Sequence, residues 1–463
     1  MHPDIKKRGF LLLLRKIKIN QKLTENLYTV NIGSVEKNED ENKNKNENEK
    51  GGGKMKRKEI VCLIFVWLLL IPSLSYSGEI DILVEKLVDK GILSLGEARA
   101  ILIETKEEIR KNLAKGKLEI LPKWIQNTKI KGDLRLRYQW EDKHDAPDRH
   151  RGRYRFRLGL ETKVNRTIKM SAGLATGGDD ARSTNQTMCD GFSTPDIRLD
   201  YAYVEWMATS WLVLKAGKIK SIKKLIFRPS DLLWDSDINP EGISCLLSKK
   251  RNNYDLFMNV GFWILDEEKE AVDPYMWIVQ PGIEYKFGKN AHLKLALAGY
   301  SFDNVKGATL TNGKNNSGKY NTLEGGVLKY NYNSISPSIE IGFKKPFGGL
   351  IPYLTVFGDY VNNPDPSENN NGYLFGIKFG DKKVKRGKWQ VKYMYRYLEK
   401  DAWIDIFPDS DAYSGHTDVK GHEFAFTYGV GKNVTLGIDY YYMERIKGIG
   451  RKHLLQLDWK IKF

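Results

Sequence analysis

Three cysteines in 463 residues are too few for a disulfide framework, and their spacing gives no metal-ligand pattern. Long apolar runs are also scarce, because the one candidate, residues 60–74, is short for a membrane-spanning helix and is flanked unsuitably for one. The mean hydropathy of −0.49 is low for a helical membrane protein. A small disulfide-rich domain and a bundle of transmembrane helices are therefore excluded.

Enzyme signatures are missing as well. His422-Glu423 lacks the second histidine of a zinc protease motif, and no G-x-S-x-G nucleophile turn occurs. The stretch 307–315, GATLTNGKN, has one spacer too many for a phosphate-binding P-loop and ends in Asn. We therefore expect no catalytic residues, no cofactor and no enzyme activity.

The net charge of +17 is spread along the chain. Residues 78–463 carry 60 Lys and Arg against 49 Asp and Glu, an excess of +11. In a nucleic-acid-binding protein the basic side chains usually gather on one face, helix or tail. Here they follow alternating strands, so we expect no nucleic-acid partner.

An export signal is present at residues 55–77, MKRKEIVCLIFVWLLLIPSLSYS. It has a cationic start, an apolar run ended by Pro72, and the small residues Ser75 and Ser77 where a signal peptidase accepts them. Residues 1–54 do not fit that plan, because they include a Glu/Asn/Lys run too polar to fold. We interpret Met55 as the true start and residues 1–54 as a non-native or disordered extension; a genuine cytoplasmic extension is the alternative.

The segment 78–128 begins with a helical pattern. Apolar residues recur at helical spacing over 79–115, Gly91 can end a first helix, and Ser94 to Glu97 fits a capping box. We predict a helical hairpin or a coiled-coil segment. Packing on or inside the following domain and self-association are equally compatible with this pattern.

After Pro122 the pattern changes to period two, which predicts about sixteen strands over residues 129–463. The predicted strands start near 130, 151, 167, 197, 211, 242, 254, 274, 291, 325 or 335, 350, 371, 388, 421, 433 and 453. A weak pair near 325 and 335 counts as one strand. Short turns alternate throughout with long polar loops, which lie at 141–150, 177–196, 219–241, 265–273, 303–323, 362–370, 399–420 and 444–451.

This alternation is typical of bacterial outer-membrane barrels, which have short periplasmic turns and long external loops. An even strand count places both termini in the periplasm. In the last strand, Leu455, Leu457, Trp459, Ile461 and Phe463 share one face and polar residues the other. Because sixteen strands enclose a space too wide for side chains to fill, the apolar face must point outward to lipid. The predicted fold is an all-β, transmembrane antiparallel barrel.

Three stretches carry a resemblance to a known family. They are LVEKLVDKGILSLGEARAIL (83–102), IKGDLRLRY (130–138) and LLWDSDINPEGI (232–243). In them the chain resembles the putative porins of Gram-negative, proteobacterial-type outer membranes. The resemblance implies a barrel that passes small solutes or ions, without naming a substrate. The alternating ending Trp459, Ile461, Phe463 is similar to the signal that the barrel-assembly machinery recognises, so we expect that machinery, outer-membrane lipid and further copies of the chain as partners.

Five arginines on the first two predicted strands share one parity: Arg135, Arg137, Arg153, Arg155 and Arg157. Their strands form a hairpin, so all five should lie on one face of the lumen. Five guanidiniums repel one another unless anions or carboxylates lie between them. The arrangement predicts either an anion-attracting pore wall or an ion-pair network with Glu161, Asp200 and Glu205.

The stretch with Asp235, Asp237, Asn239 and Glu241 begins like a calcium loop, but Pro240 stands where such a loop needs glycine. We interpret it as a structural loop that folds into the pore as a constriction.

No metal site is expected at 144–150 either. His144, Asp145, Asp148 and His150 are better interpreted as solvated loop residues than as ligands.

Together these patterns favour a passive diffusion pore with a modest anion preference. The alternative is a structural outer-membrane barrel whose helical segment mediates envelope attachment or oligomerisation. Cys189 and Cys245 are candidates for a disulfide at the external end, since both fall in or beside long loops and the compartment is oxidising.

Deleting Phe463, or replacing it with a charged residue, should impair assembly, because the alternating last strand ends on this aromatic residue. The measurement is the fraction of the chain that reaches the outer membrane in folded form. Normal insertion of the truncated chain would contradict the assignment of this strand as the closing one.

Overall fold

The computed structural model describes residues 83–114, 123–269, 271–313 and 316–463. The predicted signal peptide and the extension 1–54 lie outside these residues. The chain divides into two units, residues 1–111 and 112–463. Among the described residues, no helix combines the length and the apolar character needed to cross a bilayer.

In the first unit, residues 83–89 are helical, and a second helix, α4, begins at Leu95 and continues to Ala114. Gly91, between them, has a φ of 68°, the left-handed conformation expected at a helix end. The backbone N–H of Glu97 donates to Ser94 Oγ (3.3 Å), and the backbone N–H of Ser94 donates to Glu97 Oε2 (2.9 Å). The predicted capping box is therefore confirmed.

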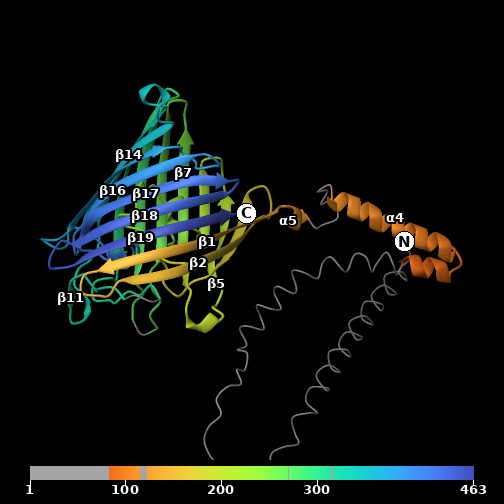
Figure 1. Ribbon diagram of the computed structural model, residues 1–463, viewed down its shortest axis with the longest axis horizontal. Helices are drawn as coiled ribbons and strands as arrows, with labels where there is room; N and C mark the ends of the chain where they lie inside the picture. The colour runs from red at the N-terminus through yellow and green to blue at the C-terminus, as the bar shows by residue number, and fades with distance from the viewer. Residues whose placement is uncertain (1–82, 115–122, 270, 314–315) are drawn as a thin grey trace, which may run out of the picture. The chain divides into compact units, whose positions relative to one another are not determined.

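The second unit is a closed barrel of sixteen antiparallel strands (Figure 1). A short helix, α5 (Lys123–Gln126), precedes it. The barrel strands are β1 (Thr128–Lys143), β2 (Arg149–Lys163), β3 (Ile168–Ala175), β5 (Arg198–Met207), β6 (Leu212–Lys218), β7 (Glu241–Lys250), β8 (Tyr254–Ile264), β9 (Tyr275–Phe287), β10 (Ala291–Asp303), β13 (Ile335–Lys344), β14 (Tyr353–Asn362), β15 (Asn371–Gly380), β16 (Trp389–Leu398), β17 (Val419–Gly431), β18 (Val434–Arg445) and β19 (Arg451–Lys462). The two-residue strand β4 (Gln186–Thr187) extends the β2 ladder, and four 3-10 turns lie at Asp190–Phe192, Ile222–Lys224, Phe347–Gly349 and Tyr413–Gly415.

Ring closure comes from the last strand. β19 pairs with β1 from Lys143↔Lys452 to Asp133↔Lys462. Gly132 and Phe463 then exchange backbone hydrogen bonds of 3.0 and 3.1 Å, and the Phe463 ring covers Gly132. The prediction that the C-terminal strand closes the barrel is confirmed.

Each barrel strand starts within three residues of its predicted position. The weak segment near 325 is not a barrel strand. It forms β11 (Leu323–Glu324) and β12 (Val327–Leu328), a small hairpin inside the long connection 304–334. Gly325 and Gly326, with φ of 63° and 89°, make its tight turn and prevent a continuous strand.

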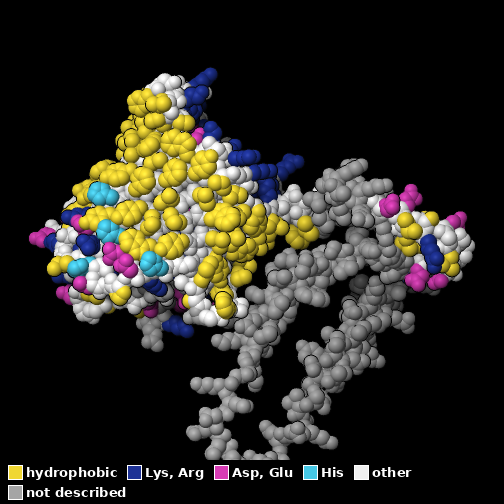
Figure 2. All heavy atoms as spheres, in the orientation of Figure 1, with side chains coloured by type: hydrophobic (Ala, Val, Ile, Leu, Met, Phe, Trp, Pro, Cys, Tyr) yellow, Lys and Arg dark blue, Asp and Glu magenta, His cyan; other side chains and the backbone are white. Residues whose placement is uncertain are grey.

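The outer surface of the barrel is apolar, as predicted (Figure 2). On β19, Leu457 and Trp459 are 41% and 48% exposed, whereas Gln456 and Asp458 are buried on the inner side. A bilayer supplies no hydrogen-bond partners, so this surface suits lipid and the polar face must point inward.

Three long connections fold into the interior: 219–240, 304–334 and 399–418. They supply most of a buried apolar cluster, here called the inner cluster, which packs on the inward side chains of β8–β10 and β14–β16. Trp234 and Trp403 lie at its centre, with ring centroids 5.4 Å apart, and Trp403 is 0% exposed. The space that side chains of the wall cannot fill is thus occupied by connecting segments.

Cys189 and Cys245 are not joined by a disulfide, so that prediction is wrong. Cys245 lies within the β7 ladder, between Leu214 of β6 and Val260 of β8. Cys189 follows β4, which pairs with β2 on another part of the wall. The strand register therefore holds Cys245 within β7, whereas Cys189 follows a strand on another part of the wall.

Replacing Trp403 with Ala should lower the free energy of unfolding of the interior by about 3–5 kcal/mol, the usual loss for a buried aromatic side chain. The measurement is urea unfolding of the folded barrel, followed by tryptophan fluorescence. Trp124→Ala serves as the control, since that side chain is 54% exposed. Equal destabilisation by the two substitutions would contradict a packing role for Trp403.

Candidate functional site: the charged interior

The five predicted arginines lie together on the inner side of β1 and β2. The β1–β2 register places Arg135 opposite Arg155 and Arg137 opposite Arg153, with Arg157 opposite Asp133. Arg135, Arg137 and Arg155 are each less than 8% exposed. We call these five side chains the arginine wall; the prediction that they share one face is confirmed.

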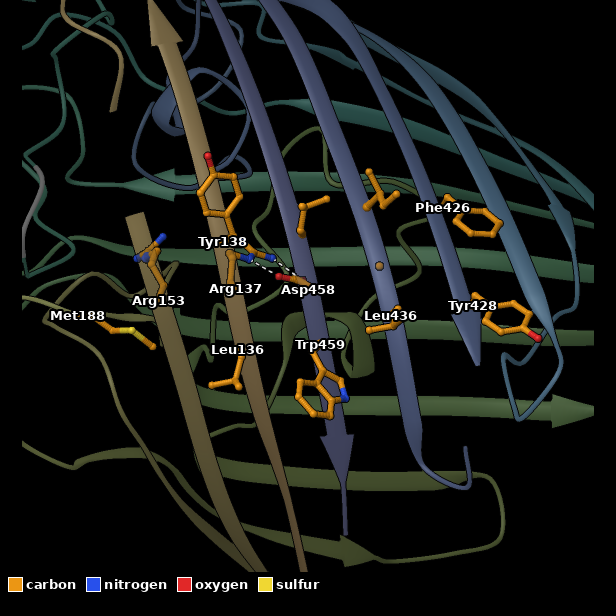
Figure 3. A pocket seen from close by; sticks show the side chains of 13 residues that line it. Leu136, Arg137, Tyr138, Arg153, Met188, Phe426, Tyr428, Leu436, Asp458 and Trp459 are labelled. Atoms are coloured by element: carbon orange, nitrogen blue, oxygen red, sulfur yellow. Dashed lines mark hydrogen bonds and ion pairs between the residues drawn. The ribbon is translucent and has the colours of Figure 1, made fainter. Parts of the chain in front are cut away.

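Carboxylates on the neighbouring strands balance much of this charge. Arg137 binds Asp458 through two hydrogen bonds of 2.6 and 2.8 Å (Figure 3). Arg155 and Arg157 share Asp133, at 2.6 and 2.9 Å. Such two-point contacts hold a guanidinium in a fixed orientation.

Figure 3 shows how the strands separate these charges from the outer surface. Arg137 and Asp458 point toward each other on one side of β1 and β19, whereas Leu136 and Trp459 project from the other side. Apolar side chains of β1, β17, β18 and β19 line a groove of about 650 Å³ there.

Among the described residues, none of the three acids predicted for an ion-pair network forms a direct ion pair with the arginine wall. Glu161 pairs with Lys131, Glu205 pairs with Lys169 and Lys215, and Asp200 accepts a hydrogen bond from Asn239. Asp458 was missed because it meets Arg137 only when β19 closes on β1.

Two interior connections reach the arginine wall. In the 219–240 connection, Asp237 pairs with Arg157 at 3.2 Å. In the 399–418 connection, Asp411 pairs with Arg137 at 3.5 Å and accepts a hydrogen bond from Gln456 at 2.8 Å. Carboxylates from two loops therefore face the wall from within the lumen.

The predicted constriction residues have different roles. Asp237 contacts the wall, and Asp235 is buried at 4% exposure. Asn239 fixes the loop base, accepting from the N–H of Ser221 at 2.6 Å. Glu241 is the first residue of β7 and pairs with Lys218, so it belongs to the strand rather than to the loop.

Asp235 connects the two loops. Its carboxylate accepts the backbone N–H of Asp237 and that of Ser410, both at 2.8 Å. Burial, with the nearby charge of Asp237, raises the pKa of Asp235 to about 7. The backbone hydrogen bonds favour the charged form but do not outweigh burial.

The tripeptide Asp-Ser-Asp occurs in both loops, at 235–237 and 409–411. In each, the first carboxylate accepts the N–H of the second Asp, at 2.8 and 3.1 Å. The sequence-based prediction identified only the first copy. The repetition of this tripeptide in two long loops was the sequence signal that could have identified the second copy.

Asp409 of the second copy also belongs to a cluster of three carboxylates. Carboxylate oxygens of Asp231, Asp409 and Glu423 lie within 4.8 Å of one another, the one such cluster among the described residues. Arg396 Nη2 lies 2.8 Å from Asp231 and 3.8 Å from Asp409, and Lys392 pairs with Glu423. Two protein cations thus already oppose this cluster.

The residues considered at 144–150 have separate partners. His144 contacts Asp145 at 3.2 Å, whereas the His150 ring shares a hydrogen bond with Tyr138 at 2.7 Å. Asp148 accepts from the Trp140 indole at 3.1 Å.

Comparison with known proteins gives a family and a fold. The family model described as "Putative porin" matches residues 142–328 and 347–463. Among solved structures, OprB of Pseudomonas putida is similar, with 9% identity and a TM-score of 0.51 over 76% of this chain and 97% of that one. OmpF of Salmonella typhi, solved in complex with daunomycin, shares 9% identity with a TM-score of 0.43, over 72% and 97% of the two chains. A sequence comparison with curated proteins found no match.

The pKa of Asp235 predicts a pH dependence. The folded chain binds this proton more tightly than the unfolded chain, whose Asp pKa is about 3.9. Stability should therefore fall as the pH rises from about 4 to about 7, and the loss should be complete above that window. Asp235→Asn should remove this contribution to the change of stability with pH. The measurement is the urea midpoint of unfolding at several values between about pH 4 and about pH 8. Exposed Glu324→Gln is the control; an unchanged slope in Asp235→Asn would contradict the assignment.

Proposed function

Because this chain belongs to the putative porin family and is an outer-membrane porin, we propose that it is a passive diffusion channel for small hydrophilic solutes and ions, with a modest preference for anions. The observation that carries this proposal is the arginine wall opposite the acidic loop residues. Solutes would pass through the lumen beside this charged wall, where Asp237 and Asp411 of the two Asp-Ser-Asp segments pair with Arg157 and Arg137.

The modest size of the preference follows from the ion pairs. Asp133 and Asp458 balance Arg137, Arg155 and Arg157 from the wall, and Asp237 and Asp411 do so from the loops. The excess of +11 over residues 78–463 still favours anions near the lumen. Such a field is screened over about 8 Å at physiological salt.

The connections support an orientation of the barrel in the membrane. Both ends of the barrel segment lie at the same end because the strand number is even, and this is the end where the short turn between β2 and β3 lies. In outer-membrane barrels this end faces the periplasm. We therefore place both termini in the periplasm, with the long connections on the external side.

Conductance across a planar bilayer tests the channel directly. The folded chain beginning at residue 78 should give steps of ohmic current, because a diffusion pore needs no voltage-driven movement. A complete absence of channels in protein shown to be folded would overturn the proposal.

Selectivity tests the role of the arginine wall. Under a salt gradient the wild type should show an anion-favouring reversal potential that shrinks as the salt concentration rises. The combined Arg135/Arg153/Arg155→Gln variant should shift the potential toward cations. A control with equal charge loss is Lys289/Lys383/Arg386→Gln, at exposed turn positions. A cation-selective wild type, or equal shifts in both variants, would show that the wall is purely structural.

A further inference from the structure

A second charged space lies on the other side of the 219–240 connection. It is a cavity of about 530 Å³ between that connection and the inward side chains of β13–β18. Its lining includes Tyr353, Gly380 and Gln390, which stand where β14, β15 and β16 meet the short turns. It therefore occupies the short-turn end of the lumen, and we call it the lysine chamber.

Four cations that line the lysine chamber form no direct ion pair among the described residues: Lys223, Arg228, Lys378 and Lys382. Lys378 Nζ donates to the Pro229 carbonyl at 3.4 Å and lies 4.2 Å from the centre of the Phe357 ring. Lys382 Nζ donates to the Tyr353 hydroxyl at 3.2 Å. These neutral contacts orient the two ammonium groups, neither of which forms a direct ion pair within the described part of the chain.

Arg228 is the most informative of the four. Its Nε donates to the Ser230 carbonyl at 3.0 Å. Its Nη1 is buried and has no hydrogen-bond partner. A buried donor without an acceptor is costly, so this position favours an incoming oxygen atom.

The acids of the chamber compensate these cations only in part, because the lining holds five Lys and Arg side chains against four Asp and Glu. Asp231 is held by Arg396 at 2.8 Å, and Asp381 by Lys388 at 3.5 Å; neither cation lines the chamber. Glu340 lies 3.3 Å from the ring of His292, which would carry a charge only when protonated. The remaining acid in the lining is Asp439. The remaining cation is Lys392, which pairs with Glu423. The lining thus keeps a positive excess.

We propose that the lysine chamber binds a small solute carrying two or more anionic oxygen groups, as carboxylates or phosphates. A guanidinium fork matches the planar carboxylate and the phosphate oxygens, and ammonium groups add point charges. The volume lies in the range of small-molecule sites. The hydroxyl of Thr355 and the amide of Gln390, also in the lining, offer neutral hydrogen bonds to the rest of such a solute. This inference rests on the proposed channel function and names its substrate class.

Binding is measured by titration calorimetry on the detergent-folded chain beginning at residue 78, with citrate, inorganic phosphate and glucose as separate probes. Citrate or phosphate should bind, with an affinity that falls as salt is added, and glucose should not. Arg228→Gln combined with Lys378→Gln should weaken binding at least about tenfold, as loss of charge-assisted hydrogen bonds predicts. Lys289→Gln, an exposed lysine in a short turn, should leave it unchanged.

Glucose binding as tight as that of citrate, or equal anion affinity in the double variant and the wild type, would overturn the proposal. Lys382→Gln gives a second variant, in case the double variant does not fold. The comparison of citrate with phosphate separates carboxylate from phosphate solutes. Calorimetry measures binding without requiring a current. Binding without conductance would therefore contradict only the proposed channel function. Conductance without binding would contradict only the proposed anion site in the lysine chamber.

Discussion

The structure depends on the closure of β19 onto β1. A bilayer offers no partner for a free strand edge, so every backbone donor and acceptor of the wall must find another strand. Closure at Gly132 and Phe463 satisfies the last of them. It also brings Asp458 beside Arg137, so that the same register that completes the hydrogen-bond ladder supplies the first counter-charge of the arginine wall.

Closure at sixteen strands makes the lumen too wide for wall side chains alone. The chain fills part of that space with three of its own connections, which bury aromatic and aliphatic residues against β8–β10 and β14–β16. The inward face of β1, β2 and β19 is charged and meets carboxylates from two of these connections. The interior therefore combines apolar contacts that hold the loops with charged side chains on β1, β2 and β19 and in the lysine chamber.

Much of this could be predicted from the sequence because it is local. Period-two alternation, turn residues and the shared parity of Arg135 to Arg157 are properties of short stretches. The partners of these arginines depend on which strands become neighbours, and Asp458 is more than 300 positions away from Arg137. The inner cluster was missed for a related reason. Loop residues such as Trp403 carry no periodic signal, and their burial depends on the width of the finished barrel.

The hydrogen bond from Ser410 to Asp235 joins positions 175 residues apart, and it sets an order of events during folding. The 219–240 connection cannot reach its final packing until residues 399–418 have arrived, when most of the wall already exists. Contacts of such long sequence separation form late, because the chain must first lose the entropy of bringing them together. The interior therefore depends on the late strands of the wall, and a chain interrupted before β16 would lack both the 399–418 connection and the closing strand β19.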